Sequence, residues 1–153
     1  FIVIASFVLG WLYQLNNKYI IGLNDVLSDR LKYIAQTMST YNIKLWGQYI
    51  EEHGNGGSII AKDNYFFIDN SFVRCMYEYG AIVFVLVIVL IFMAQKKMLD
   101  NEKYIMCLAF FIVTIASFAE HHLLEIAYNP FIFSVFACMS NNDKVIMEEK
   151  RIC

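Results

Sequence analysis

The sequence predicts an all-α membrane protein: a polytopic bundle of transmembrane helices with a partly helical extracytoplasmic loop. Two observations lead to this class. Hydrophobic residues make up 59% of the 153 residues and charged residues 17%, against about 45–50% and about 25% in soluble domains. The apolar residues are also gathered into long runs, and long apolar runs are typical of segments that cross a lipid bilayer.

The first element is an apolar stretch, and we expect residues 1–15 to be the end of a transmembrane helix. The stretch lacks the basic lead and the cleavage site of a signal peptide, so we expect the chain to start within a span of a larger protein. Residues 16–71 follow as an extracytoplasmic loop. Within it, apolar residues recur at helical spacing after Asn24, a candidate N-cap, and they predict an amphipathic helix over about residues 25–42.

Residues 72–94 hold the clearest transmembrane segment, with an apolar run from Ala81 to Met93. At about 1.5 Å per residue, such a helix crosses a hydrocarbon core of about 30 Å. Residues 95–103 are expected to be a connector, and residues 104–139 a transmembrane hairpin. Its tip would be the stretch from Glu120 to Glu125, which is too polar for the middle of a bilayer. The alternative is one long span, with the remainder at the membrane surface.

Basic residues predict the orientation of these segments. They gather in the connector and in the tail, residues 140–153: Lys96, Lys97, Lys103, Lys144, Lys150 and Arg151. Because positive residues favour the cytoplasmic side, connector and tail are expected there and the loop of residues 16–71 outside.

Two arginines are candidates for binding an anion. Arg30 lies at the flank of the apolar stripe of the predicted amphipathic helix. A guanidinium there can anchor the helix at the membrane interface, or its planar fork can bind two oxygens of a pyrophosphate. Arg74 is a candidate second phosphate contact, and it could instead form an ion pair with Glu78, four residues on.

Two polar stretches are candidates for catalysis. Asp69, Asn70 and Ser71 open the main span, where they suit an N-cap; Asp69 could also orient or deprotonate a sugar hydroxyl. Glu120 and His121 belong to the hairpin tip together with His122 and Glu125. His121 and Glu125 share a helix face, but no HExxH pattern occurs, so we expect a substrate cleft or a solvated tip, without a metal or another cofactor.

Other function classes find little support in the sequence. No run of Lys and Arg predicts nucleic-acid binding. The glycine-rich stretch of residues 53–58 is not followed by Gly-Lys-Ser/Thr and is therefore no P-loop. Aromatic residues in the outer loop suit either a membrane-interface belt or stacking on sugars; they are Tyr33, Tyr41, Trp46, Tyr49, Tyr65, Phe66 and Phe67.

Several short motifs follow one another between Asn24 and Phe131. They are Leu27-Ser-Asp-Arg-Leu31, Lys44-Leu-Trp-Gly-Gln48, Tyr65-Phe-Phe-Ile-Asp-Asn-Ser-Phe72, Tyr79-Gly80, and the stretch from Glu120 to Asn129-Pro130-Phe131. In a multi-span frame with the long loop outside, this pattern resembles the C-terminal part of Wzy-type polysaccharide polymerases, in the O-antigen ligase/polymerase superfamily.

The resemblance implies a multi-pass protein of the bacterial cytoplasmic (inner) membrane. It would be a metal-independent glycosyltransferase that polymerises undecaprenyl-pyrophosphate-linked oligosaccharide repeat units on the outer face, with a chain-length regulator as a possible partner. By position, Arg30 is the loop arginine that would bind the pyrophosphate, with Arg74 and Asn70 as further substrate contacts. Asp69, Glu120 and His121 are then the candidate catalytic residues.

Two alternatives to a polymerase remain open. The ligase branch of the superfamily carries a His-Asn pair, nine residues and then Gly. Asn70 and Gly80 keep that spacing, but Asp69 stands in place of the His, which argues against a typical ligase. A transporter, flippase or assembly subunit is the alternative outside enzymes, but transporters place charges near the bilayer midplane, whereas the stretch Ile82–Phe92 has none.

Overall fold

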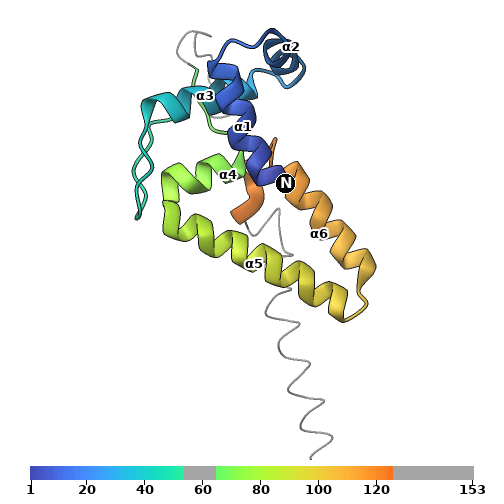
Figure 1. Ribbon diagram of the computed structural model, residues 1–153. Coiled ribbons are helices and arrows are strands. Elements are labelled where there is room, and N and C mark those ends of the chain that lie inside the picture. Colours follow the sequence, from blue (N-terminus) through green and yellow to red (C-terminus); the bar gives the residue numbers. More distant parts are fainter. Residues whose placement is uncertain (54–64, 126–153) are drawn as a thin grey trace, which may run out of the picture.

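The computed structural model describes residues 1–53 and 65–125, and these residues are mostly helical (Figure 1). The elements are α1 (Ile2–Gln14), α2 (Lys18–Val26), α3 (Arg30–Thr40), α4 (Ser71–Arg74), a π-helical turn (Cys75–Tyr79), α5 (Ala81–Asp100), α6 (Tyr104–Ala116) and a 3₁₀ turn (His122–Leu124). In these ranges no strand forms, and an isolated bridge pairs His53 with Phe66. The predicted all-α class is therefore confirmed for the described part. The expected second half of the hairpin, residues 126–139, and the expected tail, residues 140–153, lie outside it.

Within the described ranges, α5 is the one helix that is long and apolar enough to cross a membrane. Its 20 residues correspond to about 30 Å of helix. The rest of the described chain covers little of α5, and large apolar side chains such as Val85, Leu86 and Phe92 are exposed. The helices α1 and α6 are also apolar, but each has 13 residues.

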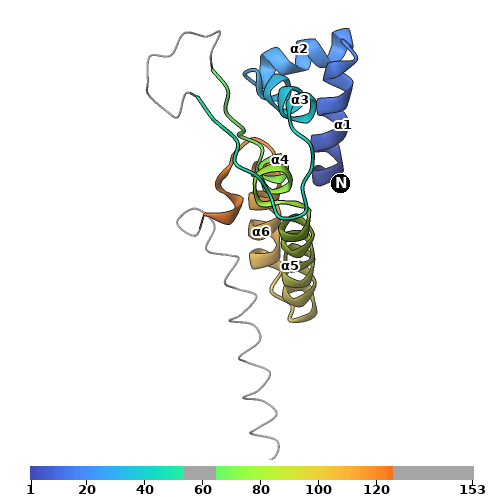
Figure 2. The same cartoon turned by 90° about the vertical axis from the view of Figure 1, so that its left-hand side faces the viewer.

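The elements form two groups (Figures 1 and 2). The helices α5 and α6 form an antiparallel pair, joined at Asn101–Lys103 and packed through Ala94, Met98 and Phe110. At the other end of this pair, α1, α2 and α3 gather, and α4 with the π-helical turn lies between the two groups. In the group of α1, α2 and α3, α1 packs so closely on α3 that a Cβ at Gly10 would collide with Ile34.

The predicted amphipathic helix of residues 25–42 is divided in the structure. The helix α2 ends at Val26, and α3 begins at Arg30, after Ser28 and Asp29 adopt φ values of +53° and +65°. Asn24, expected as an N-cap, lies buried within α2. Its Oδ1 accepts a hydrogen bond of 3.0 Å from the backbone N–H of Lys32, so this side chain serves the first turn of α3 from a neighbouring helix.

The predicted helix of residues 72–94 is interrupted at Gly80. Two short helical turns, Ser71–Arg74 and Cys75–Tyr79, precede Gly80, whose φ is +95°. Part of the loop docks at this break: Gln48 N donates to Glu78 O at 3.0 Å, and Ala81 N donates to Lys44 O at 3.0 Å. The loop backbone thereby supplies partners to groups that a continuous helix would have paired internally.

Candidate functional site

Four of the predicted site residues meet where the two groups of helices join. Arg30 Nε lies 3.6 Å from Asp69 Oδ2, and Arg30 Nη2 lies 3.4 Å from Glu120 Oε1. His121 Nδ1 lies 4.0 Å from Asp69 Oδ1. The fold thus brings together a cation, two carboxylates and an imidazole from three segments that are far apart in the sequence.

The backbone of Arg30 is fixed by its helix, whereas the ionic contacts of its side chain are long. It is the first residue of α3, and the next residue, Leu31, is fully buried. Both ionic contacts of Arg30 exceed the roughly 2.7–2.9 Å of a charge-assisted hydrogen bond, and they use two of the five N–H donors that a guanidinium carries. The side chain of Arg30 is 28% exposed, and its predicted contact with pyrophosphate stays a prediction.

Asp69 and His121 have environments that disfavour their charged forms. Burial raises the pKa of Asp69, while the positive charges of Arg30 and His121 oppose this rise. Burial lowers the pKa of His121 below 6.5, and His122 and Arg74 lower it further. His121 is therefore neutral near pH 7, as a proton acceptor must be.

Ser71 fixes the segment that carries Glu120 and His121. Its backbone N–H donates to Ser117 O at 3.0 Å, its hydroxyl donates to the carbonyl of Glu120, and the same hydroxyl oxygen accepts from Leu123 N at 3.2 Å. The ring of Phe67 meets His121 edge to face, with centroids 5.1 Å apart. The start of α4 thus positions both catalytic candidates of the tip.

Arg74 lies in a different setting from Arg30. Its Nε donates to Glu78 at 2.9 Å, its Nη2 donates to Glu52, and its guanidinium lies over the ring of Phe67 at 4.9 Å. The side chain is only 14% exposed. The predicted ion pair with Glu78 is present, and these contacts give Arg74 a role in joining the loop to the helix, while a phosphate contact stays a prediction.

Glu52 is the residue that the sequence reasoning missed. It accepts a hydrogen bond of 3.0 Å from Ile68 N and pairs with Arg74. Glu52 and Arg74 are 22 residues apart, so no helical spacing relates them. The available signal was a general one: a charged residue in the first turns of a membrane span is usually paired, but this signal does not identify the partner.

Asn70 caps the helix that follows it. Its Oδ1 accepts from Phe72 N and Val73 N, each at 3.0 Å, and its Nδ2 donates to Ser6 Oγ at 3.0 Å and to Phe118 O at 2.9 Å. The residue is 1% exposed. These contacts give Asn70 a structural role, and its predicted contact with substrate stays a prediction.

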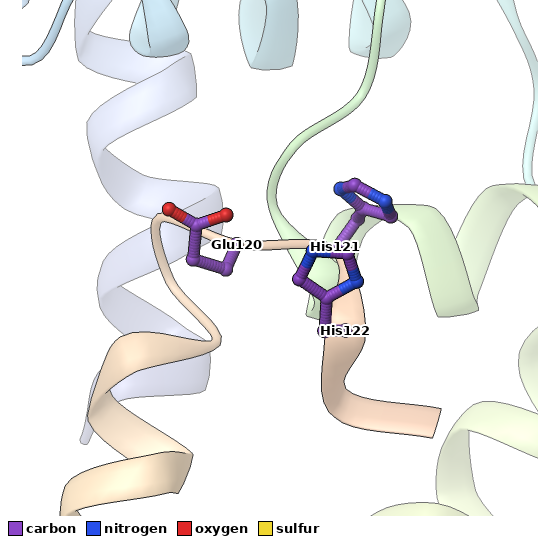
Figure 3. Close-up of side chains that lie close together, drawn as sticks. All are labelled: Glu120, His121 and His122. Atoms are coloured by element: carbon purple, nitrogen blue, oxygen red, sulfur yellow. The ribbon is translucent and has the colours of Figure 1, made fainter. Parts of the chain in front are cut away.

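Three neighbouring residues offer atoms of the kind that bind metals. One ligand atom from each of Glu120, His121 and His122 lies within 4.8 Å of the others. The centroids of the two imidazole rings lie 3.9 Å apart, and Figure 3 shows the carboxylate of Glu120 to one side of the rings. The guanidinium of Arg30 lies against Glu120, and the charge of Arg74 acts on His121. Arg74 is itself paired with Glu52 and Glu78, and Glu125 lies 3.6 Å from His121 Nε2 and 3.1 Å from His122 Nδ1, so charges of both signs surround this cluster. The expected absence of a metal stays a prediction.

A small cavity of about 90 Å³ opens beside His121, lined also by Ser71, Arg74, Tyr79, Leu124 and Glu125. A water molecule takes up about 30 Å³ in the liquid. The cavity therefore suits a hydroxyl group or a few waters next to the imidazole, and a whole sugar ring would have to lie outside it.

The chain matches no protein-family model, no curated protein and no solved structure. What the fold and the site define is a class: an all-α protein with a candidate membrane helix and a site of arginine, carboxylates and histidine near one end of that helix. The resemblance to Wzy-type polymerases stays a prediction.

Proposed function

We propose that this chain belongs to a multi-pass membrane glycosyltransferase that polymerises undecaprenyl-pyrophosphate-linked oligosaccharides, as Wzy-type polymerases do. The helices α1, α5 and α6 would lie in the bacterial cytoplasmic membrane, with the cluster of Arg30, Asp69, Glu120 and His121 at its outer face. The transferase would need no metal.

One observation carries this proposal: a partly exposed arginine, a neutral histidine and two carboxylates converge next to the first turns of an apolar helix. A lipid-linked pyrophosphate places its charge at the membrane surface and its apolar chain below it. Arg30 would bind the pyrophosphate and stabilise the negative charge that grows on it as the bond to the sugar breaks. Arg30 would thus offer a positive charge to a leaving group that lies at the membrane surface.

The proposed reaction needs a base for the acceptor hydroxyl. The hydroxyl oxygen of one repeat unit forms a bond to the anomeric carbon of a second, and the bond from that carbon to undecaprenyl pyrophosphate breaks. The hydroxyl proton passes to the base, for which His121 suits best because its lowered pKa keeps it neutral. Asp69, 4.0 Å from His121 Nδ1, would orient the ring and stabilise its protonated form.

An apolar cavity supports a lipid-linked donor. Its volume is about 400 Å³, and it is bounded by the start of α1, by α5 and α6, and by Phe72. Phe72 is next in the chain to Ser71, which positions the tip with Glu120 and His121. Part of a polyprenyl chain would fit between these helices, with the rest of the chain in the surrounding lipid.

The test is a gel of the products formed by the complete protein in vesicles that contain the lipid-linked repeat unit. Wild type should give a ladder of multiples of the repeat. Arg30→Ala should lower the rate by about 100-fold, the effect of losing one donor to a developing charge. Lys32→Ala removes a cation from an exposed neighbouring position of α3 and should leave the ladder nearly intact.

Each other outcome has a definite meaning. A ladder unchanged by Arg30→Ala would reject the pyrophosphate role of this arginine. A single transfer to a different acceptor would indicate a ligase. Absence of any new glycosidic bond, with folded protein and intact substrate, would reject the enzyme and favour a transporter, flippase or assembly subunit.

A further inference from the structure

The loop that docks at the break before α5 carries a group of exposed apolar side chains. Ile43, Leu45, Trp46 and Tyr49 are 48%, 63%, 84% and 87% exposed. Large exposed aromatic side chains that gather in one short segment mark an interaction surface. We name residues 43–49 the aromatic loop, and it takes no part in the cluster around Arg30.

The aromatic loop has a fixed position relative to α5. Gln48 N donates to Glu78 O at 3.0 Å, Ala81 N to Lys44 O at 3.0 Å, and Ile82 N to Leu45 O at 3.3 Å. These bonds join the loop to the backbone on both sides of the break. Figures 1 and 2 show the loop reaching down to the joint between α4 and α5.

Two glycines allow this close approach. Gly47 and Gly80 have φ values of +81° and +95°. A Cβ at Gly47 would lie 3.0 Å from Tyr79 Cα, and one at Gly80 would lie 2.8 Å from the carbonyl carbon of Trp46. The two backbones therefore pack directly on each other, and the aromatic loop cannot move far from the first turn of α5.

We propose that the aromatic loop is a membrane-interface anchor that inserts Trp46 and Tyr49 among the lipid headgroups. The inference rests on the proposed membrane placement of α5 and is independent of any transferase activity. If α5 spans the bilayer, its first residues lie at the boundary between hydrocarbon and headgroups. The loop is bonded to those same residues, so its exposed side chains lie at that depth.

The chemistry of the loop fits this partner. Trp and Tyr have amphipathic rings and concentrate at membrane interfaces, where one part of the ring is apolar and the other is wet. Lys44 can extend its ammonium group toward phosphate groups while its methylenes stay in the apolar layer. Val83 and Val85, in the first turns of α5, are also exposed, and Ile82 between the loop and these residues donates its N–H to Leu45 O, so one lipid surface would cover both.

The anchor would set the height of the candidate site above the membrane. The segment that follows the loop carries Glu52, which pairs with Arg74 at the start of the main span. An aromatic loop fixed in the headgroup layer therefore holds the segment with Glu52 against the elements that carry Asp69 and His121. A lipid-linked pyrophosphate would then meet Arg30 at a constant depth.

Tryptophan fluorescence in vesicles tests the inference sharply, because the chain has two tryptophans, Trp11 and Trp46. Trp11→Phe leaves Trp46 as the single probe. The full chain is reconstituted in phosphatidylcholine–phosphatidylglycerol vesicles that contain lipids brominated either near the headgroup or near the middle of the acyl chain. We expect Trp46 emission at short wavelength, quenched severalfold more by the shallow bromines than by the deep ones.

Two matched controls use a chain without either native tryptophan. Phe92→Trp places the probe on the exposed face of α5, and the deep bromines should quench it more. Tyr19→Trp places it at an exposed position of α2, which Figures 1 and 2 show far from α5, and neither lipid should quench it strongly.

Two results would overturn the inference and separate it from the proposed function. If Trp46 emits as in water while the probe of the Phe92→Trp variant is quenched, α5 enters the membrane and the loop does not, so the loop serves a sugar or a protein partner. If neither probe is quenched, the membrane placement itself fails, and the proposed function fails with it.

Discussion

At the scale of single residues, the charge state of His121 decides what the site can do. A buried imidazole loses solvation when it is charged, and His122 and Arg74 add to that penalty, so the pKa of His121 lies below 6.5. Glu125, and to a smaller extent Asp69, work in the opposite direction, because their negative charges favour the protonated ring. This opposition suits a base that must be neutral at rest and charged in the transition state.

A pH profile tests this assignment. If neutral His121 is the base, the turnover rate is constant around neutral pH and falls at lower pH, as the ring takes up a proton. His122→Gln removes one of the causes that lower the pKa of His121, so the acid limb should move to higher pH. The rate of repeat-unit transfer in vesicles, measured from pH 5 to pH 8, is the readout.

The third histidine of the chain is the control for this experiment. His53 lies in the loop with its side chain 50% exposed, and His53→Gln should leave the acid limb in place. The free energy of unfolding also decreases as the pH falls from 6.5 to the native pKa of His121, because over this range the unfolded chain binds more protons than the native chain. Rates are therefore compared only where the protein stays folded. An acid limb that His122→Gln does not move would reject His121 as the base.

At the scale of elements, two breaks shape the site, and neither was predicted. The apolar run from Phe72 predicts one helix, and composition says nothing of Gly80 leaving helical geometry. That departure depends on Lys44–Gln48 docking against Glu78 and Ala81, a contact between distant parts of the sequence that no local pattern reports. The break between α2 and α3 likewise depends on the αL backbone of Ser28 and Asp29, where a helical pattern would continue.

The sequence could predict the features that depend on local composition, and it could not predict those that depend on contacts between distant residues. Helical periodicity and long apolar runs depend on local composition, so the all-α class and the apolar segments were within reach. Arg30, Asp69, Glu120 and His121 could be chosen singly for their chemistry. Their convergence, with Arg30 and Glu120 90 residues apart, and the pairing of Glu52 with Arg74 are tertiary facts without a local signal.

Gly80 and Gly22 form a matched pair that tests the role of the break. Gly80→Ala forces a side chain into a backbone at φ +95° and against the carbonyl carbon of Trp46, which should cost about 1–3 kcal/mol. Gly22 lies inside α2, where a Cβ would meet nothing within 4 Å, and Gly22→Ala should add up to about 1 kcal/mol of stability.

Thermal unfolding in detergent micelles, followed by circular dichroism, measures both variants. Gly80→Ala should also release the aromatic loop, so Trp46 should become more accessible to an aqueous quencher in micelles. Equal stability of Gly80→Ala and wild type would mean that the docking of the loop is not rigid, and it would remove the basis for a fixed anchor.

At the scale of the whole molecule, charge and apolar surface divide along one axis. The α5–α6 pair ends at the turn Asn101–Lys103, near Lys96 and Lys97. The cluster around Arg30 lies at the other end of the same pair. Between them, α5 is uncharged from its first residue up to Lys96. Because lysine side chains can extend from the hydrocarbon to the headgroups, its length of about 30 Å can cross a bilayer. Under the proposed membrane placement, the basic end would lie in the cytoplasm and the site would face outward.

Cysteine labelling in whole cells tests this division with two equivalent positions. Asn42 and Asn101 are both exposed asparagines outside the helices, one beside the aromatic loop and one between α5 and α6. In a chain whose four native cysteines are replaced by alanine, Asn42→Cys should react with a membrane-impermeant maleimide in intact cells freed of their outer barriers. Asn101→Cys should react only after the membrane is permeabilised, because α5 places the two residues on opposite sides.

Labelling of both positions in intact cells would show that α5 does not separate two compartments. Labelling of Asn101→Cys alone would place the Arg30 site in the cytoplasm, where polymerisation of outward-facing repeat units could not occur.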